Sequence, residues 1–250
     1  MQLYNTAADL GLPAAMHALA RMHDRGRGTP RDLAKAAAHY RRAADLGYPP
    51  SMASLGTMLE FGEGGATNQV EALSLYRRAA ELGDAGGMTS LAYLYVAGKG
   101  VNRDYVEARR WYKAAADAGQ SRAMFNLALM NIRGEGAAPD FAEAVHWLSV
   151  ATEKGHTGAM RELAFLLDEG RGVTRDPVRA ANYLLAAFKQ GNKNARDDLY
   201  GRSGAWSLAT RREVQQALAR QELYRGRISG VIDGATRKAL DAFAGAGKAG

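Results

Sequence analysis

The sequence predicts an all-α fold, in which a solenoid of helix-turn-helix repeats is followed by a small C-terminal helical domain. The first observation is a period of 36 residues, marked by a recurring Gly-x-Gly motif: Gly26/Gly28, Gly62/Gly64, Gly98/Gly100, Gly134/Gly136 and Gly170/Gly172. The second is an apolar column with the same period: Leu19, Leu55, Leu91, Leu127, Leu163 and Leu199. Such a period is typical of repeat proteins, in which each unit buries its apolar face by stacking on its neighbours.

Residues 1–11 fall on the columns that hold second helices later in the chain. Tyr4 and Gly11 are in register with Tyr40 and Gly47. We therefore expect residues 1–11 to form the second helix of a truncated repeat. A helix that lacks its partner exposes an apolar face, so we expect a fragment of a longer protein or a start site set too far downstream. A signal peptide or membrane anchor could then precede Met1.

Residues 12–191 are expected to form five complete repeats. In the third repeat, Met88, Leu91, Ala92 and Tyr95 are spaced i, i+3, i+4 and i+7, which predicts one buried face of a helix. Gly98 ends this helix, because glycine readily adopts the left-handed conformation at a helix C-terminus.

The second helix of each repeat is expected to begin at a capping residue. This column holds side chains that accept hydrogen bonds from the free N–H groups of a first turn: Asp32, Asn68, Asp104, Asp140 and Asp176. In the third repeat the helix runs to Gly119, and small residues such as Ala108 and Ala115 allow close helix packing. A nucleotide-binding phosphate loop would need a preceding strand and a Gly-Lys-Ser/Thr ending, so the glycine motif indicates architecture.

The third repeat reads Leu91-Ala92-x-x-Tyr95-x-x-Gly98-x-Gly100-Val101-x-x-Asp104, then Ala108-x-x-Trp111-Tyr112-x-x-Ala115-Ala116-x-x-Gly119. This pattern resembles the Sel-one-like repeat family, a relative of the tetratricopeptide repeats, and the resemblance covers about residues 2–200. It implies a right-handed α/α superhelix that serves as a protein-interaction scaffold without chemistry of its own.

Beyond the repeats the period ends. We expect residues 192–205 to hold a last partial repeat helix and a linker, and residues 206–243 to form a small helical domain. Thr210 and Glu213 match a capping box, which predicts a helix over about 211–222. A last short helix carries Leu240 and Phe243, and residues 244–250 are expected to be disordered.

The C-terminal region has three characteristic stretches: Val214-Gln215-Gln216-Ala217-Leu218, Leu223-Tyr224-x-Gly226-x-Ile228-Ser229-Gly230-Val231-Ile232-Asp233-Gly234 and Ala239-Leu240-x-x-Phe243. Together they resemble the peptidoglycan-binding domain of cell-wall hydrolases. Ser229-Gly230 replaces the family's Asp-Gly, and Ala244 replaces its Gln. The resemblance implies glycan contacts at Tyr224, Arg225, Arg227 and Arg237. The alternative is that Tyr224 packs the loop and the arginines are solvated. Repeats followed by such a domain also resemble the periplasmic part of alphaproteobacterial polar-localisation scaffolds.

Composition limits the function classes. The chain has no cysteine, which excludes disulfides and thiolate chemistry, and no apolar run is long enough to span a membrane. The net charge is +7, and residues 191–250 hold eleven Lys or Arg against six Asp or Glu. This basic tail favours an anionic partner such as a glycan polymer or lipid headgroups, or simply keeps the protein in solution. We expect no nucleic-acid partner.

We find no sequence pattern for catalysis. The histidines fall on different repeat columns without metal-ligand spacing, so no metal and no cofactor is expected. The acidic pairs Asp168-Glu169 and Asp197-Asp198 are interpreted as solvated. The chain is therefore predicted not to be an enzyme.

A protein-binding face is expected where the first helices line the concave side of the stack. Its stripe begins with His17, Arg21 and Asp24, is polar in the early repeats and becomes apolar later. The residues proposed to bind a partner helix or peptide are Tyr93, Val96, Phe125, Leu129, Ile132 and Phe165. The alternative is that these residues are buried between repeats or under the C-terminal domain.

The sequence thus predicts a non-enzymatic scaffold of the bacterial cell envelope, in the periplasm, that binds a protein partner and possibly peptidoglycan. One alternative is a cytoplasmic or regulatory scaffold whose C-terminal domain only caps the last repeat. Another is the non-catalytic part of a cell-wall hydrolase.

Overall fold

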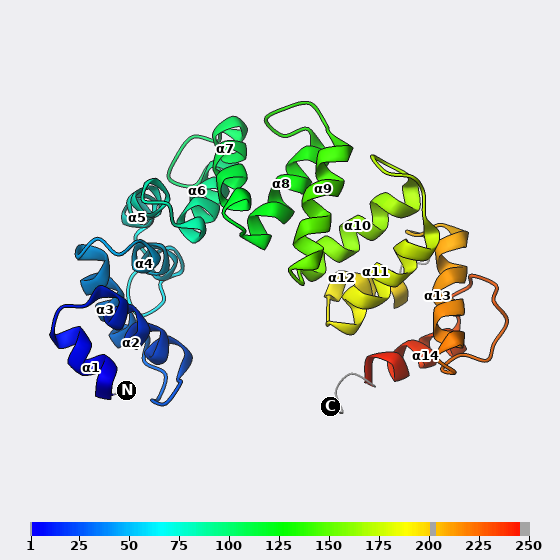
Figure 1. The fold of residues 1–250 in the computed structure, drawn as a ribbon, viewed down its shortest axis with the longest axis horizontal. Helices are drawn as coiled ribbons and strands as arrows, with labels where there is room; N and C mark the ends of the chain where they lie inside the picture. The colour runs from blue at the N-terminus through cyan, green and yellow to red at the C-terminus, as the bar shows by residue number, and fades with distance from the viewer. Residues whose placement is uncertain (1, 201–203, 246–250) are drawn as a thin grey trace. The chain divides into compact units, whose positions relative to one another are not determined.

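The computed structural model describes residues 2–200 and 204–245, and every regular element in these ranges is a helix (Figure 1). The helices are α1 (Gln2–Asp9), α2 (Pro13–Arg25), α3 (Leu33–Asp45), α4 (Pro49–Phe61), α5 (Gln69–Glu81), α6 (Ala85–Ala97), α7 (Tyr105–Asp117), α8 (Ser121–Arg133), α9 (Phe141–Glu153), α10 (Thr157–Glu169), α11 (Pro177–Lys189), α12 (Lys193–Tyr200), α13 (Leu208–Arg220) and α14 (Gly234–Gly245). None of these helices combines the length and the apolar character that crossing a membrane requires.

The chain divides into two compact units. The first contains the residues up to 123 together with 135–137, and the second contains 124–134 and the residues from 138 onward. Within the first unit each helix packs on the next along the chain, from α1 to α7, and α4 also contacts α6. This order of contacts is that of stacked helix pairs, so the predicted all-α solenoid is confirmed.

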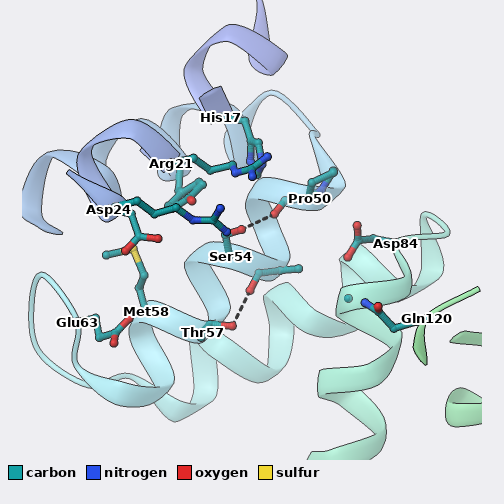
Figure 2. Close-up of a pocket in the computed structure, with 14 residues that line it drawn as sticks. His17, Arg21, Asp24, Pro50, Ser54, Thr57, Met58, Glu63, Asp84 and Gln120 are labelled. Atoms are coloured by element: carbon teal, nitrogen blue, oxygen red, sulfur yellow. Dashed lines mark hydrogen bonds between the residues drawn. The ribbon is translucent and has the colours of Figure 1, made fainter. Parts of the chain in front are cut away.

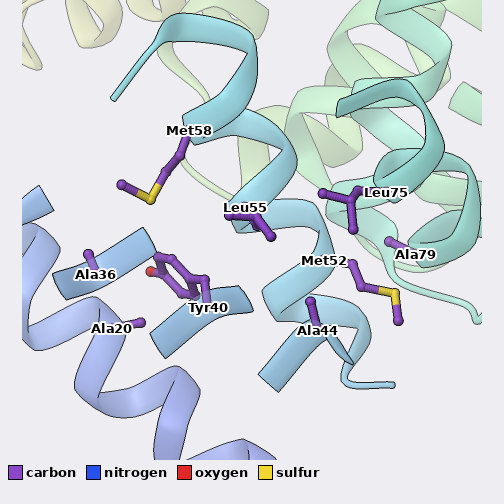
Figure 3. Packing of buried hydrophobic residues seen from close by; sticks show 9 residues of the cluster. All are labelled: Ala20, Ala36, Tyr40, Ala44, Met52, Leu55, Met58, Leu75 and Ala79. Atoms are coloured by element: carbon purple, nitrogen blue, oxygen red, sulfur yellow. The ribbon is translucent and has the colours of Figure 1, made fainter. Parts of the chain in front are cut away.

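The core of the first unit is built from the repeated apolar columns. In Figure 3, Tyr40 from α3 lies beside Leu55 and Met58 from α4, while Met52 and Leu75 face each other from α4 and α5. Ala36 and Ala79 are fully buried, and such small side chains let neighbouring helices approach closely. One layer of side chains therefore joins two successive repeats.

The predicted capping column begins the second helices. The side chains of Asp32, Asn68, Asp104, Asp140 and Asp176 all accept hydrogen bonds from backbone N–H groups of their first turns. The first helices end at glycines. Gly98, which follows α6, adopts φ +66°, in the left-handed region expected for a C-terminal cap.

The second glycine of the Gly-x-Gly motif has a further role between repeats. Gly64 has φ +80°, and a Cβ there would overlap the Leu33 carbonyl at the start of α3. Gly136 approaches the Tyr105 carbonyl at the start of α7 in the same way. At Gly64 and Gly136 the motif is therefore a place where two successive repeats touch through their backbones.

In the second unit the C-terminal helices pack on the last repeat. α11 contacts α10, α12, α13 and α14, and α13 also contacts α14. The predicted capping box at Thr210 is wrong, because α13 begins earlier, at Leu208, and Ser207 accepts the hydrogen bond from the Thr210 N–H. The predicted helix over 211–222 thus starts three residues sooner and ends at Arg220.

Asp168, at the end of α10, is buried, so its interpretation as solvated is wrong. Its carboxylate accepts hydrogen bonds from the Ser207 N–H at 2.7 Å, from the Ser207 hydroxyl and from the Thr210 hydroxyl at 2.7 Å. This contact joins the start of α13 to the fifth repeat. The neighbouring Glu169 is exposed, because adjacent helical residues point in different directions.

Asp198 is also buried, and it accepts a hydrogen bond from Arg161 Nε at 2.7 Å, while Asp197 is exposed. On α12, the Tyr200 hydroxyl donates to Asp241 of α14 at 2.5 Å. Burial is the main cause that raises the pKa of Tyr200 to about 12, and this hydrogen bond is the second.

The tail predicted to be disordered falls partly outside the described residues. Ala244 and Gly245 are the last residues of α14, so that part of the prediction is wrong. Residues 246–250 and the linker residues 201–203 are not among those that the structure describes.

Candidate protein-binding surface

The first unit contains a polar hollow of about 400 Å³ on the side of its first helices (Figure 2). Helices α2 and α4 form most of it, and the start of α6 closes one side. The hollow is lined by His17, Arg21, Asp24, Arg25, Tyr40, Pro50, Ala53, Ser54, Thr57, Met58, Glu63, Asp84, Gly86 and Gln120. The predicted stripe of His17, Arg21 and Asp24 is thus part of a concave surface.

Two hydroxyls of α4 line the floor of this polar hollow. Ser54 donates to the Pro50 carbonyl at 2.8 Å, and Thr57 donates to the Ala53 carbonyl at 3.1 Å (Figure 2). Thr57 also accepts from the Tyr76 hydroxyl at 3.1 Å. Because each hydroxyl hydrogen is used within the helix, both side chains can only accept hydrogen bonds from a ligand. Thr57 has one lone pair left for this, since Tyr76 uses the other.

His17 lies at one end of the polar hollow. Its Nδ1 is 2.9 Å from the Oγ of the buried Ser51, and its ring packs on Tyr40 and Tyr48 at centroid distances of 5.3 and 5.4 Å. Burial, reinforced by Arg21 and opposed by Asp84, holds the pKa of His17 below its ordinary value of 6.5. The imidazole is therefore disfavoured as a cation.

The charges around the polar hollow are of both signs. Arg21 and Arg25 are exposed on α2, while Asp24, Glu63 and Asp84 contribute carboxylates. Asp84 is committed to the fold, because it accepts from the Gly87 N–H at 2.7 Å as the N-cap of α6. Such a surface suits a polar polypeptide better than an apolar ligand.

Of the six residues predicted to bind a partner, Tyr93 and Val96 belong to the first unit. The Tyr93 side chain is 38% exposed, and its hydroxyl accepts a hydrogen bond from Lys99 Nζ at 3.2 Å. Lys99 Nζ also lies 3.6 Å from a carboxylate oxygen of the buried Glu60. Val96 is half-buried. The pair thus lies at the surface, although only Tyr93 is substantially exposed.

The other four predicted residues belong to the second unit, and all are half-buried: Phe125, Leu129, Ile132 and Phe165. Phe125 stacks on His156 with ring centroids 4.6 Å apart. Phe165 meets the buried Trp206 edge to face at 5.8 Å. Phe165 therefore packs against the segment that leads into α13, as the burial alternative anticipated for it.

The predicted glycan residues also separate into two groups. Tyr224 is buried, its hydroxyl donates to the Arg227 carbonyl at 2.9 Å, and it accepts from Gln215 at 3.3 Å. Its side chain is thus part of the domain's interior, and the structure removes it from the accessible glycan candidates. Arg225, Arg227 and Arg237 are exposed.

Sequence reasoning missed several residues that line the concave side, among them Arg25 and Ser54. Arg25 follows Asp24, and Ser54 follows Ala53; Asp24 and Ala53 are the positions that were assigned to the binding stripe. The columns 18, 21 and 25 are spaced as one face of a helix, so a wider stripe would have included them.

The family model described as Sel1 repeat matches the chain in five consecutive copies, at residues 13–48, 49–84, 85–120, 121–156 and 157–192. Among curated proteins, none shows significant sequence similarity to this chain.

Solved structures give independent support for the fold. A Sel1 repeat protein from Oxalobacter formigenes is 27% identical with a TM-score of 0.69, over 93% of this chain and 84% of the other. A protective antigen of uropathogenic Escherichia coli with an SLR fold, c5321, is 27% identical with a TM-score of 0.71, over 97% of this chain. This chain covers 56% of that protein, just over half its length. The immunity protein PA5088 from Pseudomonas aeruginosa is 20% identical with a TM-score of 0.57, over 94% of this chain and 83% of the other, which shows the shared fold alone.

Proposed function

The chain belongs to the Sel1 repeat family, and on this premise we propose that it is a non-enzymatic scaffold that holds a protein partner on the faces of its first helices. Repeat solenoids of this class offer extended surfaces for protein interaction. The proposal places one binding surface in the polar hollow of the first unit.

The observation that carries the proposal is the composition of that hollow. Its lining combines the hydroxyls of Ser54 and Thr57 with the exposed Arg21 and Arg25. A polypeptide supplies N–H donors for the hydroxyl oxygens and carboxylates or carbonyls for the arginines. Within the described residues, no group of three or more His, Asp or Glu side chains is arranged to hold a metal ion.

Blocking the hollow tests the proposal. Ser54→Arg places a long cation on its floor, whereas Ser74→Arg makes the same change on the exposed surface of α5. Tagged proteins would be purified from the native host, and their co-purifying proteins would be quantified by mass spectrometry. We expect a partner that is retained by wild type and Ser74→Arg but lost from Ser54→Arg, with unchanged circular dichroism. If both variants retain every partner, the hollow is not the binding surface.

The apolar residues of the first-helix stripe complete this proposal. Tyr93 and Val96 would contribute apolar contact in the first unit, and Phe125, Leu129 and Ile132 would do so in the second. Half-buried apolar side chains can add contact area to a partner without being core residues. Phe165 contributes less, because Trp206 already packs on it.

We further propose that the protein acts in the bacterial cell envelope, in the periplasm, and binds peptidoglycan through the C-terminal helices. The support is the sequence resemblance of residues 206–243 to peptidoglycan-binding domains and the exposure of Arg225, Arg227 and Arg237. With Tyr224 buried, the contact would rest on the arginines and the carbonyls of their loop.

Co-sedimentation with purified peptidoglycan tests the glycan contact. We expect wild type to pellet at physiological salt and the triple variant Arg225→Gln/Arg227→Gln/Arg237→Gln to remain in the supernatant. A control with Arg77→Gln, Arg78→Gln and Arg110→Gln removes the same charge from exposed positions of α5 and α7. If both variants lose binding equally, the protein binds peptidoglycan through its net positive charge and not through these three arginines.

A second candidate function for the C-terminal helices has a specific observation in its favour. The contacts of Asp168 with Ser207 and Thr210, and of Phe165 with Trp206, attach these helices to the fifth repeat. Solenoids need terminal caps that cover the apolar face of the last repeat. If wild type does not pellet with peptidoglycan, capping is the role that remains for α13 and α14.

A further inference from the structure

A second hollow adjoins the polar hollow and differs from it in charge. It encloses about 490 Å³ and shares Arg25, Ser54 and Thr57 with the polar hollow. It extends to Ser90 of α6 and to Arg122 at the end of the first unit. We call it the cationic hollow, because its lining includes two arginines, Arg25 and Arg122, and no carboxylate.

The two arginines are available to a ligand. Both are exposed, and in the described parts of the chain neither forms an ion pair or a side-chain hydrogen bond. A guanidinium carries several N–H donors in a rigid plane that matches a carboxylate. Two such groups on one concave surface, without an acidic neighbour among the lining residues, favour an anionic ligand.

The floor restricts the class of anion. The hydroxyl hydrogens of Ser54 and Thr57 are donated to their own helix, as is that of the buried Thr89, which bonds the Ala85 carbonyl at 2.7 Å. The floor therefore offers acceptors, which suit a ligand that carries N–H groups. A polypeptide has such groups along its backbone, whereas a polyphosphate chain has none.

The neighbouring polar hollow sets the direction of the ligand. Three carboxylates, Asp24, Glu63 and Asp84, offset Arg21 and Arg25 there, whereas no carboxylate lines the hollow between Arg25 and Arg122. An acidic ligand residue is therefore attracted more strongly between Arg25 and Arg122 than at the other end. Neutral or basic residues of the same ligand fit beside the carboxylates.

We propose that the partner segment held by the first unit is acidic, and that Arg25 and Arg122 bind its carboxylates while Ser54 and Thr57 accept hydrogen bonds from its backbone. This inference rests on the proposed scaffold function and specifies the chemistry of the partner.

Titration with a short fluorescein-labelled peptide of alternating glutamate and serine tests the inference by fluorescence anisotropy. The full chain should bind this peptide more tightly than the same peptide with glutamine in place of glutamate. Arg25→Gln/Arg122→Gln should weaken binding at least about tenfold, because two charge-assisted hydrogen-bonding groups are lost. Arg77→Gln/Arg78→Gln, which removes two exposed arginines from α5, should leave the affinity within about twofold.

Several outcomes would overturn the inference. They are equal binding of the glutamate and glutamine peptides, equal weakening by the two double variants, or polyphosphate of equal charge binding as tightly as the glutamate peptide. The scaffold proposal is judged separately, by the partner that Ser54→Arg loses in cells. If such a partner is found but no glutamate peptide binds, the scaffold function stands and the acidic class is wrong.

Discussion

Asn131 lies in α8 without exposed surface, and neither its amide nitrogen nor its amide oxygen has a hydrogen-bond partner in the described part of the chain. The same column holds Leu59 and Leu167 in two other repeats, and His23 and Tyr95 in the remaining two. A buried amide without partners lowers stability, because it loses its hydrogen bonds to water on folding. Leucine at this column in two other repeats indicates that an apolar side chain fits the position.

We expect Asn131→Leu to raise the free energy of unfolding by about 1 kcal/mol, since it removes the cost of the unsatisfied amide. Urea denaturation followed by circular dichroism measures this change. Asn126→Leu is the matched control, because Asn126 is half-buried on the same helix and its substitution should be nearly neutral. Destabilisation by Asn131→Leu would mean that the amide makes a stabilising contact.

His17 provides a pH-dependent contribution to stability. Its pKa in the folded protein is held below the ordinary 6.5, first by burial and then by Arg21. The unfolded chain binds this proton more readily, so the contribution of His17 is complete above about pH 6.5 and is lost progressively as the pH falls below that value.

His17→Gln should therefore flatten the pH dependence of unfolding. Between about pH 7.5 and 5, the free energy of unfolding of wild type should fall more steeply than that of the variant. His39, whose pKa is also lowered, is present in both proteins, so its effect cancels in the comparison. If the free energy of unfolding depends on pH in the same way in both proteins, His17 has the same pKa in the folded and the unfolded chain.

The helices and their turns follow from rules that repeat along the sequence. The aspartates and the asparagine of the capping column were identified because an N-cap needs only a short polar side chain and a free first turn. The predicted start of α13 was wrong because Thr210 and Glu213 match a capping box, whereas Ser207 lacks a Glu or Gln three residues later and matches only the N-cap preference for serine. The sequence could not show that the Thr210 hydroxyl would bond Asp168, which is 42 positions away.

The glycine motif allows a prediction about contacts between repeats. Gly47 and Gly64 both have positive φ, +83° and +80°, but a Cβ at Gly47 meets no atom within 4 Å. Gly47→Ala should cost about 1 kcal/mol from backbone strain alone. Gly64→Ala should cost at least about twice as much, because the Cβ also meets the Leu33 carbonyl. Equal costs in thermal unfolding would show that the two repeats separate freely at this point.

The joint between α10 and α13 depends on Asp168. Asp168→Asn replaces a carboxylate that accepts from Ser207 and Thr210 by an amide whose NH₂ group faces donors. We expect a loss of about 2 kcal/mol in the free energy of unfolding and faster proteolysis of α13 and α14. Glu169→Gln, at the exposed neighbouring position, should change neither. An equally stable Asp168→Asn protein would contradict this role.

At the scale of the whole molecule, the sequence predicted the packing contacts that are repeated and missed side-chain contacts that occur once. The solenoid could be predicted because the columns of Leu55 and Ala36 recur every 36 residues, so each contact is indicated several times. The buried roles of Asp168 and Asp198 could not, because each depends on a single partner from a different part of the chain. An acidic pair that occurs once in a sequence does not indicate which distant residue will donate a hydrogen bond to it.

The polar hollow was predictable in part for the same reason. His17, Arg21 and Thr57 stand on columns that the helical period assigns to one face, and the structure brings them together in the polar hollow. The contributions of Arg25 and Arg122 depend on how α2, α4 and α6 pack and where α8 begins, which the column pattern does not specify. The partner-binding role of the apolar residues from Tyr93 to Ile132 stays a prediction.

Site-specific photocrosslinking in the native host tests the central claim, that the first helices hold a protein partner, most directly. A photoreactive amino acid would replace Ser54 and Ser90 on the first helices, and Ser74 on α5 as the matched control. We predict one discrete protein adduct from positions 54 and 90 and none from position 74. Adducts from position 74 alone, or none from positions 54 and 90 in folded protein, would contradict the claim.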